Sequence, residues 1–448
     1  MSDCPVEPED SVPSTGKMGF SMLRALRSGN YRLFFAGQAI SVLGSFMQMA
    51  ALGWLVYKLE GKPFLLGATV FATQIPVFLL GPLAGVLADR VDKRRLLVAL
   101  LSLAACQATA LSVLTFTGVI EVWHILALGS MAGLVSAFEI PTRQSFVVQM
   151  VSNKNDLPNA IALNSFLING GKLIGPSLGG LLIAGVNSAA GDGQHRVVLG
   201  EAVCFAANAV SFLAVIVSLL RMRLAPHIPS KTHPHILRSL KEGFDYAWQF
   251  KPIRVQLLLT AVVSLMALQY NTLVPIFARD ILRGDSTLNG LLLSAPAIGA
   301  LIGATYMASR RNALGLAEAV AVAPLLLGAA LIGFGLSHNW LLSVALMVPV
   351  GLGQMIQVAG ANTLLQTIVD DDKRGRVMSF HAMSFMGMGP FGALLLGTLA
   401  QKLGAPTTLV LSGGAAMAAA LAFLFWLPAH RRLLAPVYER LGISPRKT

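Results

Sequence analysis

Twelve apolar runs dominate this chain of 448 residues, and each is long enough to cross the roughly 30 Å hydrocarbon core of a bilayer as a helix. Within a bilayer every backbone polar group needs a partner inside the protein, so only helices or a closed barrel can span it. The composition agrees, because 55% of the residues are hydrophobic, 12% are charged and the mean hydropathy is +0.67. We therefore predict an all-α polytopic membrane protein with twelve transmembrane helices, at approximately 33–57, 64–88, 96–118, 123–143, 160–185, 199–220, 254–278, 288–308, 316–337, 341–367, 378–401 and 407–427.

The longest polar connection between these runs, residues 221–252, divides them six and six. The two halves resemble each other, since Gly175-Pro176 recurs as Gly389-Pro390, and Gly81 and Gly85 recur as Gly299 and Gly303 at nearly the same separation. Such repetition predicts two pseudo-symmetric six-helix bundles around a midplane cavity, as in many secondary transporters. The predicted domains are a disordered cytoplasmic tail (1–30), an N-terminal bundle (31–220), a cytoplasmic linker with an amphipathic helix (221–252), a C-terminal bundle (253–428) and a cytoplasmic tail (429–448).

The chain carries a net charge of +13, from 34 Lys and Arg against 21 Asp and Glu. Most of the basic residues fall on the side of the predicted helices that also holds both termini. This bias places both termini in the cytoplasm, with the lipid bilayer as the partner of the charge. A nucleic-acid partner is not expected, because topology explains the excess of positive charge.

Neither cofactors nor metals are expected. Cys4, Cys106 and Cys204 follow no pairing or metal-binding spacing. His227, His233 and His235 lie close together, but the prolines between them disfavour a helical ligand set. A nucleotide-binding Gly-x-x-x-x-Gly-Lys-Ser/Thr sequence is absent from the chain, so ATP is not expected to power it.

The fifth apolar run contains Gly171-Lys-Leu-Ile-Gly-Pro-Ser-Leu-Gly-Gly180. Its glycines leave one helix face without side chains, so a neighbouring backbone can approach closely. Pro176 removes a backbone donor and bends the helix. Lys172 lies near mid-membrane, where an ammonium is costly unless it faces protein or water. We interpret this helix as lining an interior cavity; the alternative is simple close packing, with Lys172 extending toward the cytosol.

A second stretch, Gly85-Val-Leu-Ala-Asp-Arg-Val-Asp-Lys-Arg-Arg-Leu-Leu97, joins the second and third runs. Asp89 at a helix end is followed by a basic group that includes Arg90, Lys93 and Arg94. We interpret it as an ionic latch that holds one conformation at the cytoplasmic surface. The alternative is an ordinary cytoplasmic loop that obeys the charge bias.

This stretch resembles the loop motif of the major facilitator superfamily, Gly-x-Leu-Ala-Asp-Arg-x-Gly-Arg-Lys-x-x-Leu, with Asp92 in place of the second glycine. The fifth run resembles the superfamily's antiporter motif, matched in full by Gly171, Gly175, Pro176, Gly179 and Gly180. The resemblance implies that Gly85 packs tightly and that Asp89 stabilises the outward-facing state. Further segments resemble the branch of enterobactin and macrolide exporters: 30–34, 141–144, 242–248 and 374–379.

Glu139 and Arg143 lie four residues apart at the cytoplasmic end of the fourth run, close enough to form an ion pair on one helix. Glu139 is also within reach of Lys172 on the next helix. Either pairing makes Glu139 the first candidate for a proton carrier, with Arg143 and Lys172 as candidate coupling or substrate residues; a static salt bridge is the alternative. Glu201 and His381 are weaker candidates. Uncharged polar residues in the runs are candidates for lining the cavity: Gln38, Gln48, Gln74, Asn164, Asn169, Asn208, Gln269, Asn271, Gln354, Gln357 and Asn362.

The sequence thus predicts a monomeric secondary transporter of the inner membrane that exports a small drug-like or siderophore-like compound by alternating access, in exchange for protons. Three alternatives remain: an importer or lipid flippase on the same scaffold, a membrane sensor without transport, and an intramembrane prenyl transferase. The last rests on Asp370-Asp-Asp372 and lacks the facing acidic cluster that a magnesium diphosphate site needs. We therefore do not predict an enzyme.

Overall fold

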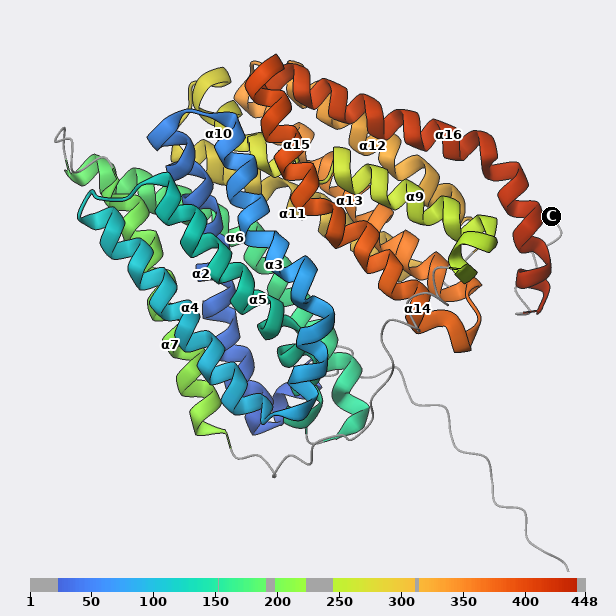
Figure 1. Cartoon of the computed structure of the whole chain (residues 1–448), viewed down its shortest axis with the longest axis horizontal. Coiled ribbons are helices and arrows are strands. Elements are labelled where there is room, and N and C mark those ends of the chain that lie inside the picture. Colours follow the sequence, from blue (N-terminus) through green and yellow to red (C-terminus); the bar gives the residue numbers. More distant parts are fainter. Residues whose placement is uncertain (1–22, 152, 191–197, 223–244, 311–313, 441–448) are drawn as a thin grey trace, which may run out of the picture.

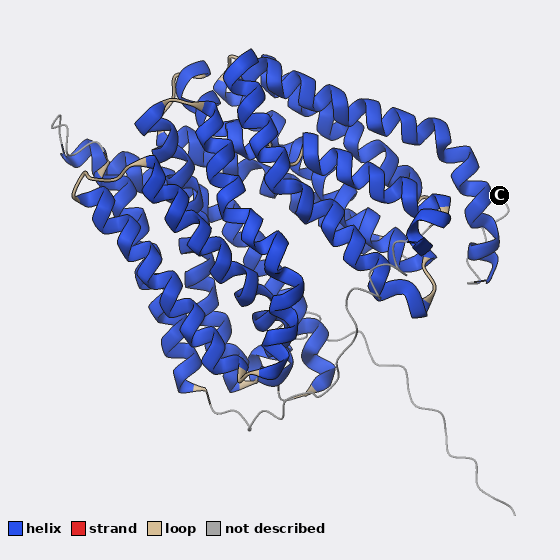
Figure 2. Cartoon of the chain, in the orientation of Figure 1, coloured by secondary structure: helices blue, strands red, loops and turns tan. Residues whose placement is uncertain are grey.

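The computed structural model describes residues 23–151, 153–190, 198–222, 245–310 and 314–440, and within these the side chains of residues 82, 85–89, 154, 190, 371 and 372 are left undescribed. All the regular secondary structure of the described residues is helical (Figure 2). Twelve of its helices or helical runs are long and apolar enough to cross a membrane, which confirms the predicted count.

The first six spans form one bundle of long helices. A short 3₁₀ turn, η1 (Arg24–Arg27), precedes them, and η2 (Lys154–Asp156) joins the fourth span to the fifth. The six helices are α2 (Gly29–Glu60), α3 (Pro63–Arg90), α4 (Lys93–Phe116), α5 (Val122–Met150), α6 (Leu157–Ala190) and α7 (Leu199–Arg221).

The second six spans form the other bundle, and two of them are interrupted. The interrupted seventh span consists of α9 (Lys251–Met266), η4 (Tyr270–Leu273), α10 (Val274–Ile276) and the π-helical η5 (Phe277–Ile281). The eleventh consists of α14 (Asp371–Ala382), the π-helical η6 (Met383–Gly387) and α15 (Met388–Leu403). The uninterrupted spans are α11 (Ser286–Ser309), α12 (Leu316–Leu336), α13 (Trp340–Ile368) and α16 (Ala405–Arg440).

Serine hydroxyls satisfy backbone carbonyls that the two interruptions release. Ser264 Oγ donates to the Phe385 carbonyl at 2.5 Å, inside η6, and Ser412 Oγ donates to the Met266 carbonyl, where α9 ends. Irregular backbone at membrane depth persists only where protein or a water-filled cavity covers it. The interruption of the seventh span was not predicted, and neither was the length of α16, which continues past its predicted end at residue 427 to Arg440.

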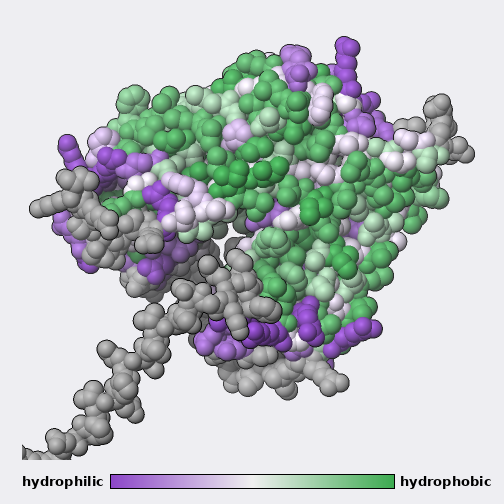
Figure 3. All heavy atoms as spheres, turned by 180° about the vertical axis from the view of Figure 1, so that it is seen from behind, coloured by the Kyte–Doolittle hydropathy of each residue, from purple (hydrophilic) through white to green (hydrophobic). Residues whose placement is uncertain are grey.

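The helix ends define two faces of the molecule. We call the face with the first residue of α2 and the last of α16 the terminal face, and the opposite one the far face. Figure 1 shows the two bundles close together at the far face and diverging toward the terminal face. Apolar side chains cover much of the surface between the faces (Figure 3). The exposed apolar residues of the spans include Leu79, Val210, Ile302 and Phe425. This apolar band is what a bilayer would cover.

Matching helix pairs hold each bundle together, and small residues permit the close approach. In the first bundle Gly133 of α5 faces the Thr73 carbonyl of α3. In the second, Gly351 of α13 faces the Pro296 carbonyl of α11. The second-to-fourth span contact is thus repeated between the eighth and tenth spans, as the predicted pseudo-symmetry requires.

The two bundles meet along two seams near the far face. The serine seam joins α6 to α11 through Ser177, Gly180, Ser286, Gly290 and Ser294. The phenylalanine seam joins α3 to α15 through Gly67, Phe71, Phe78, Phe391 and Ala393. Both seams bring backbones together, since a Cβ at Gly180, Gly290 or Gly67 would collide with the Ser286, Pro176 or Ala393 carbonyl respectively.

Candidate functional site

A cavity of about 590 Å³ lies between the bundles, a volume typical of sites for small organic ligands. The first bundle supplies most of its wall, from α2, α3, α4, α5 and α7, and the interrupted seventh span closes the other side. The break in that span presents Gln269, Asn271 and Thr272 to the cavity.

Side-chain amides give the cavity its polar character. Gln38, Gln48, Gln74, Asn208, Gln269 and Asn271 line it, so six of the eleven polar residues proposed from the sequence do face the cavity. Gln107 lines it as well and was missed, although it lies in the middle of an apolar run where a buried amide needs partners. Apolar side chains such as Phe46, Met49 and Phe212 line the cavity as well, together with hydroxyl groups such as those of Ser45 and Thr73.

Three of these amides form a chain across the first bundle. Asn208 Nδ2 donates to Gln48 Oε1 at 2.8 Å, and Gln48 Nε2 donates to Gln107 Oε1 at 3.4 Å. Asn208 Oδ1 also accepts from Ser211 Oγ at 3.0 Å. The chain fixes the orientation of each amide, so the cavity wall offers hydrogen bonds in set directions.

Several of the remaining candidates from the polar list have local partners or lie in the protein interior. Asn169 donates to the Ser165 carbonyl at 2.9 Å, and Asn362 accepts from Gln366 at 3.1 Å. Gln357 is buried inside the second bundle, and neither of its amide atoms has a hydrogen-bond partner in the described structure. These residues do not line the cavity.

Glu139 and Arg143 form the predicted ion pair, with Arg143 Nε 2.7 Å from Glu139 Oε1. Both line the cavity, and their side chains are 17% and 13% exposed. Arg143 Nη1 also donates to Asn164 Oδ1 at 3.4 Å, which ties α5 to α6. The pair places one carboxylate and one guanidinium in a wall that otherwise consists of neutral residues.

Lys172 lies apart from this pair. Its side chain is exposed and does not line the cavity, and Glu139 has Arg143 as its partner instead. On the helical wheel Lys172 lies between the face of α6 that contacts α2 and the face that contacts α11. The pairing with Glu139 that the sequence left open is therefore not formed in this conformation.

The glycines of the fifth-run motif contact two different helices. A Cβ at Gly171 would collide with Val42 of α2, one at Gly175 would lie 2.7 Å from Phe46 Cβ, and one at Gly179 would lie 2.9 Å from Met47 Cγ. Gly180 instead faces Ser286 of α11, and the Pro176 carbonyl faces Gly290. The motif thus packs α6 between its own bundle and the other one.

The loop motif has a defined structure where it is described. Asp92 caps α4, because its Oδ1 accepts from Arg95 N at 3.0 Å. The backbone φ of Asp92 is −61°, which any residue can adopt, so the glycine of the family's motif is not required at this position. Arg94 Nη2 donates to the Leu220 carbonyl at 2.6 Å, at the end of α7. Lys93 is buried and Arg90 is exposed. The surroundings of Gly85 and the side chain of Asp89 are not part of the described structure. Residues 227–235, with their three histidines, also lie outside it.

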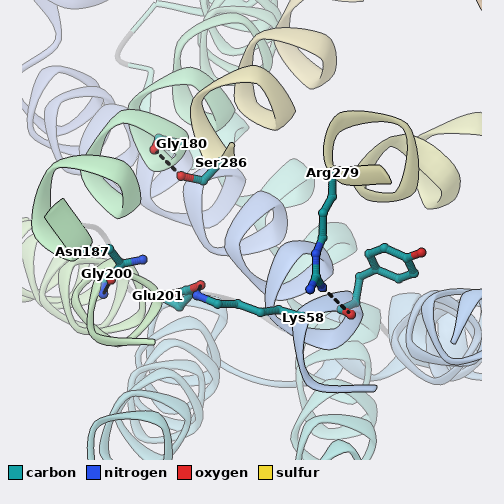
Figure 4. A network of polar contacts seen from close by, with 8 residues as sticks. Lys58, Gly180, Asn187, Gly200, Glu201, Arg279 and Ser286 are labelled. Carbon is teal, nitrogen blue, oxygen red and sulfur yellow. Dashed lines mark hydrogen bonds and ion pairs between the residues drawn. The ribbon is translucent and has the colours of Figure 1, made fainter. Parts of the chain in front are cut away.

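A polar cluster closes the far face beside the serine seam (Figure 4). The Tyr57 hydroxyl of α2 donates to Asp280 of η5, and Arg279 Nη1 donates to the Tyr57 carbonyl at 3.3 Å. Lys58 Nζ lies 3.0 Å from Glu201 Oε1 on α7. Of this cluster the sequence had singled out only Glu201, because partners more than 200 positions apart carry no local pattern.

Known proteins resemble this chain along nearly its whole length. A profile of the transmembrane secretion effector family matches residues 20–435. The staphyloferrin A transporter of Staphylococcus aureus (strain NCTC 8325 / PS 47) is 26% identical over 88% of this chain and 95% of its own length. The multidrug efflux pump Tap of Mycolicibacterium fortuitum is 25% identical over 82% of this chain and 88% of its own. Macrolide efflux protein A of Streptococcus pyogenes is 22% identical over 86% and 93%.

Solved structures share the fold. A bacterial homologue of the iron transporter ferroportin, crystallised in an inward-facing state, superposes with a TM-score of 0.69 at 16% identity, over 89% of this chain and 98% of its own. The nucleoside transporter NupG superposes with a TM-score of 0.66 at 14% identity, over 89% and 99%. At these identities the likeness concerns the fold alone.

Proposed function

Because the chain belongs to the transmembrane secretion effector family of the major facilitator transporters, we propose that it exports a small organic compound from the cytoplasm by alternating access, in exchange for protons. The observation that carries this proposal is the cavity between the bundles, combined with the contact of the bundles near the far face and their divergence toward the terminal face among the described residues. Two bundles that share a central cavity and touch at one face are the expected form of one state of such a cycle.

The orientation follows from charge. We place the terminal face in the cytoplasm and the far face outside, in the inner membrane of a bacterium, because the basic residues gather on the terminal side. The conformation described here is then inward-open. Residues 31–220 and 253–428 are the two moving bodies in this proposal, and residues 221–252 connect them on the cytoplasmic side.

The substrate is a drug-like or siderophore-like compound of mostly neutral character. The names of the relatives support this class, since they include a siderophore transporter and drug efflux pumps. The cavity supports it as well, because its oriented amides and apolar side chains suit a bulky molecule with several hydrogen-bonding groups. A monomer is sufficient, as one chain encloses the whole cavity.

Glu139 is the proposed proton carrier of the cavity, positioned by Arg143. A carboxylate beside a cavity can take up a proton when the cavity faces one side and release it when the cavity faces the other. Lys172 belongs to the same moving body as this pair, so it stays apart from Glu139 and remains a candidate for contacting the substrate between the bundles. In the outward-facing state Asp89, Arg90, Lys93 and Arg94 hold the cytoplasmic ends together, and Gly85 permits the contact.

The test uses everted membrane vesicles loaded with acid, to which staphyloferrin A, erythromycin and ethidium are added in turn. We expect at least one of them to accumulate in the vesicles and to dissipate the proton gradient, and Glu139→Gln to lower both effects at least tenfold. Glu439→Gln, an exposed carboxylate at the end of α16, is the matched control and should behave as wild type. Accumulation only in intact cells would identify an importer, and a binding ligand without proton movement would exclude proton exchange.

A further inference from the structure

Lys172 lies near the middle of α6, about 22 Å from the start of the helix at Leu157 and about 27 Å from its end at Ala190. Its side chain is exposed, and it has no ion-pair or hydrogen-bond partner among the described residues. An ammonium at this depth of a bilayer is costly unless water or an anion lies beside it. The surroundings of Lys172 therefore decide what compensates its charge.

The exposed side of Lys172 faces the gap between the bundles and not the lipid. The exposed apolar residues Ile174 and Leu181 lie on the opposite side of α6, because they follow Lys172 by two and nine positions. Ile168, one turn before Lys172, lines the cavity. Lys172 thus borders the cavity on the side of α6 that turns toward α11.

Lys172 also marks the point where the gap between α6 and α11 ends. Ser165, two turns nearer the terminal face on the same side of α6, is exposed. Pro176, one turn nearer the far face, is buried, and its carbonyl faces Gly290 of α11. Since the bundles diverge from this contact toward the terminal face (Figure 1), a compound that enters from that face reaches Lys172 at the closed end of the gap.

The described α-helices that pack against α6 offer no free acid to Lys172. Neither α6 nor α11 contains an Asp or a Glu, and the only acid of α2 is its last residue, at the far face. On α5, Glu139 is paired with Arg143 at 2.7 Å, and on α7, Glu201 is paired with Lys58 at 3.0 Å. The positive charge in the gap is therefore available to an anion from outside the chain.

We propose that Lys172 binds a carboxylate group of the compound that the cavity holds. This inference rests on the proposed function and narrows its substrate class to a bulky, mostly neutral compound with an acidic group. Gly171 packs against Val42 and Phe46, which both line the cavity, so the ammonium adjoins a wall that can hold the body of the compound. A lysine ammonium offers three donors, and hydrogen bonds between ionised groups are stronger than those between neutral ones.

The test measures binding to the purified full chain in a non-ionic detergent, by the fluorescence of three dansyl compounds. Dansylglycine carries a carboxylate, dansylglycinamide is neutral, and dansylcadaverine carries an ammonium. We expect the wild type to bind dansylglycine at least tenfold more tightly than the amide. Lys172→Gln should remove this preference and bind the amide within twofold of wild type, Lys172→Arg should keep the preference, and Lys172→Glu should favour dansylcadaverine.

The matched control is Lys402→Gln, which removes an exposed lysine near the end of α15 and should bind all three compounds as the wild type does. Lys172→Met replaces Lys172→Gln if that variant does not fold. An undiminished preference in Lys172→Gln overturns the inference, and so does a wild type that binds dansylglycine no better than the amide or does not bind it.

A second arm separates a transported compound from a lipid headgroup. Displacement of dansylglycine by phosphatidylglycerol, but not by phosphatidylcholine, would identify a lipid site and overturn the assignment. The binding assay contains neither a membrane nor a gradient, so its outcome does not depend on proton exchange. Vesicles that accumulate none of the compounds offered would refute the proposed export, whereas a missing preference for dansylglycine would refute the role of Lys172 alone.

Discussion

The two seams between the bundles have the same backbone geometry but different side-chain chemistry. In the serine seam Ser286 Oγ donates to the Gly180 carbonyl at 3.0 Å, and Ser177 Oγ lies 2.9 Å from Ser294 Oγ. In the phenylalanine seam Phe391 contacts Phe71 and Phe78 edge to face, with ring centroids 5.9 and 6.1 Å apart. The two seams therefore share the close glycine–backbone contacts, as pseudo-symmetry requires, but the side chains around these contacts differ: hydroxyl groups in one seam and aromatic rings in the other.

This difference suggests that the two seams have different roles when the far face opens. Hydroxyl–carbonyl contacts are short and directional, and they break once the helices separate. Edge-to-face aromatic contacts tolerate sliding because their energy depends less on an exact position. We therefore expect the serine seam to separate as a unit and the phenylalanine seam to slide, and three substitutions test this comparison.

Gly180→Leu should have the largest effect. A side chain at this position meets the Ser286 backbone, which cannot move aside, so the serine seam cannot close. We expect transport to fall at least a hundredfold, while the protein inserts in the membrane at the wild-type level. Gly185→Leu on the same helix meets nothing within 4 Å and should transport normally. Equal transport by the two variants would show that transport does not require the serine seam to close.

Phe391→Ala should have an intermediate effect. Each aromatic pair contributes about 0.5–1.5 kcal/mol beyond its buried area, so losing two pairs destabilises the closed far face by about 1–3 kcal/mol. We expect an impermeant reagent added outside to label a cysteine at Thr69, a buried residue of α3 that lines the cavity, about tenfold faster, because the outward-open form gains population. The lipid-facing Phe425→Ala is the control. Unchanged labelling would mean that the phenylalanine seam does not stabilise closure.

Ser294→Ala should have the smallest effect. It removes the hydroxyl that accepts from Ser177 Oγ at 2.9 Å and, at a longer 3.2 Å, from Ser177 N. A net loss of about 0.5–1.5 kcal/mol should shift the two states by about two- to tenfold. A double-mutant cycle with Ser177→Ala measures this coupling directly in a thermal-shift or labelling assay. A coupling energy of zero would show that the Ser177–Ser294 hydroxyl contact does not help to hold the serine seam closed.

Much of this architecture follows from the sequence, because it depends on local patterns. Hydropathy predicted the twelve spans, the glycine spacing predicted close helix contacts, and a separation of four residues predicted the Glu139–Arg143 pair. Each of these features depends only on residues within one helix or on the length of one apolar run.

What the sequence could not predict depends on the rotation of helices and on distant partners. The seventh span carries Gln269, Asn271 and Thr272, but hydropathy alone does not distinguish a polar face of a continuous helix from a break that exposes Gln269 to the cavity. Tyr57 and Asp280 meet only after the bundles dock. The sequence also predicted glycine contacts without saying that Gly175 faces its own bundle while Gly180 faces the other.

The central claim is that the two bundles rock about these seams, and spin-label distances test it most directly. One pair of labels at Thr117 and His338 spans the far face, and another at Arg95 and Arg432 spans the terminal face; all four residues are exposed. We expect a transported ligand or a lower outer pH to lengthen the first distance and shorten the second. Two distances that stay fixed with a ligand that binds, or that change in the same direction, would contradict the account.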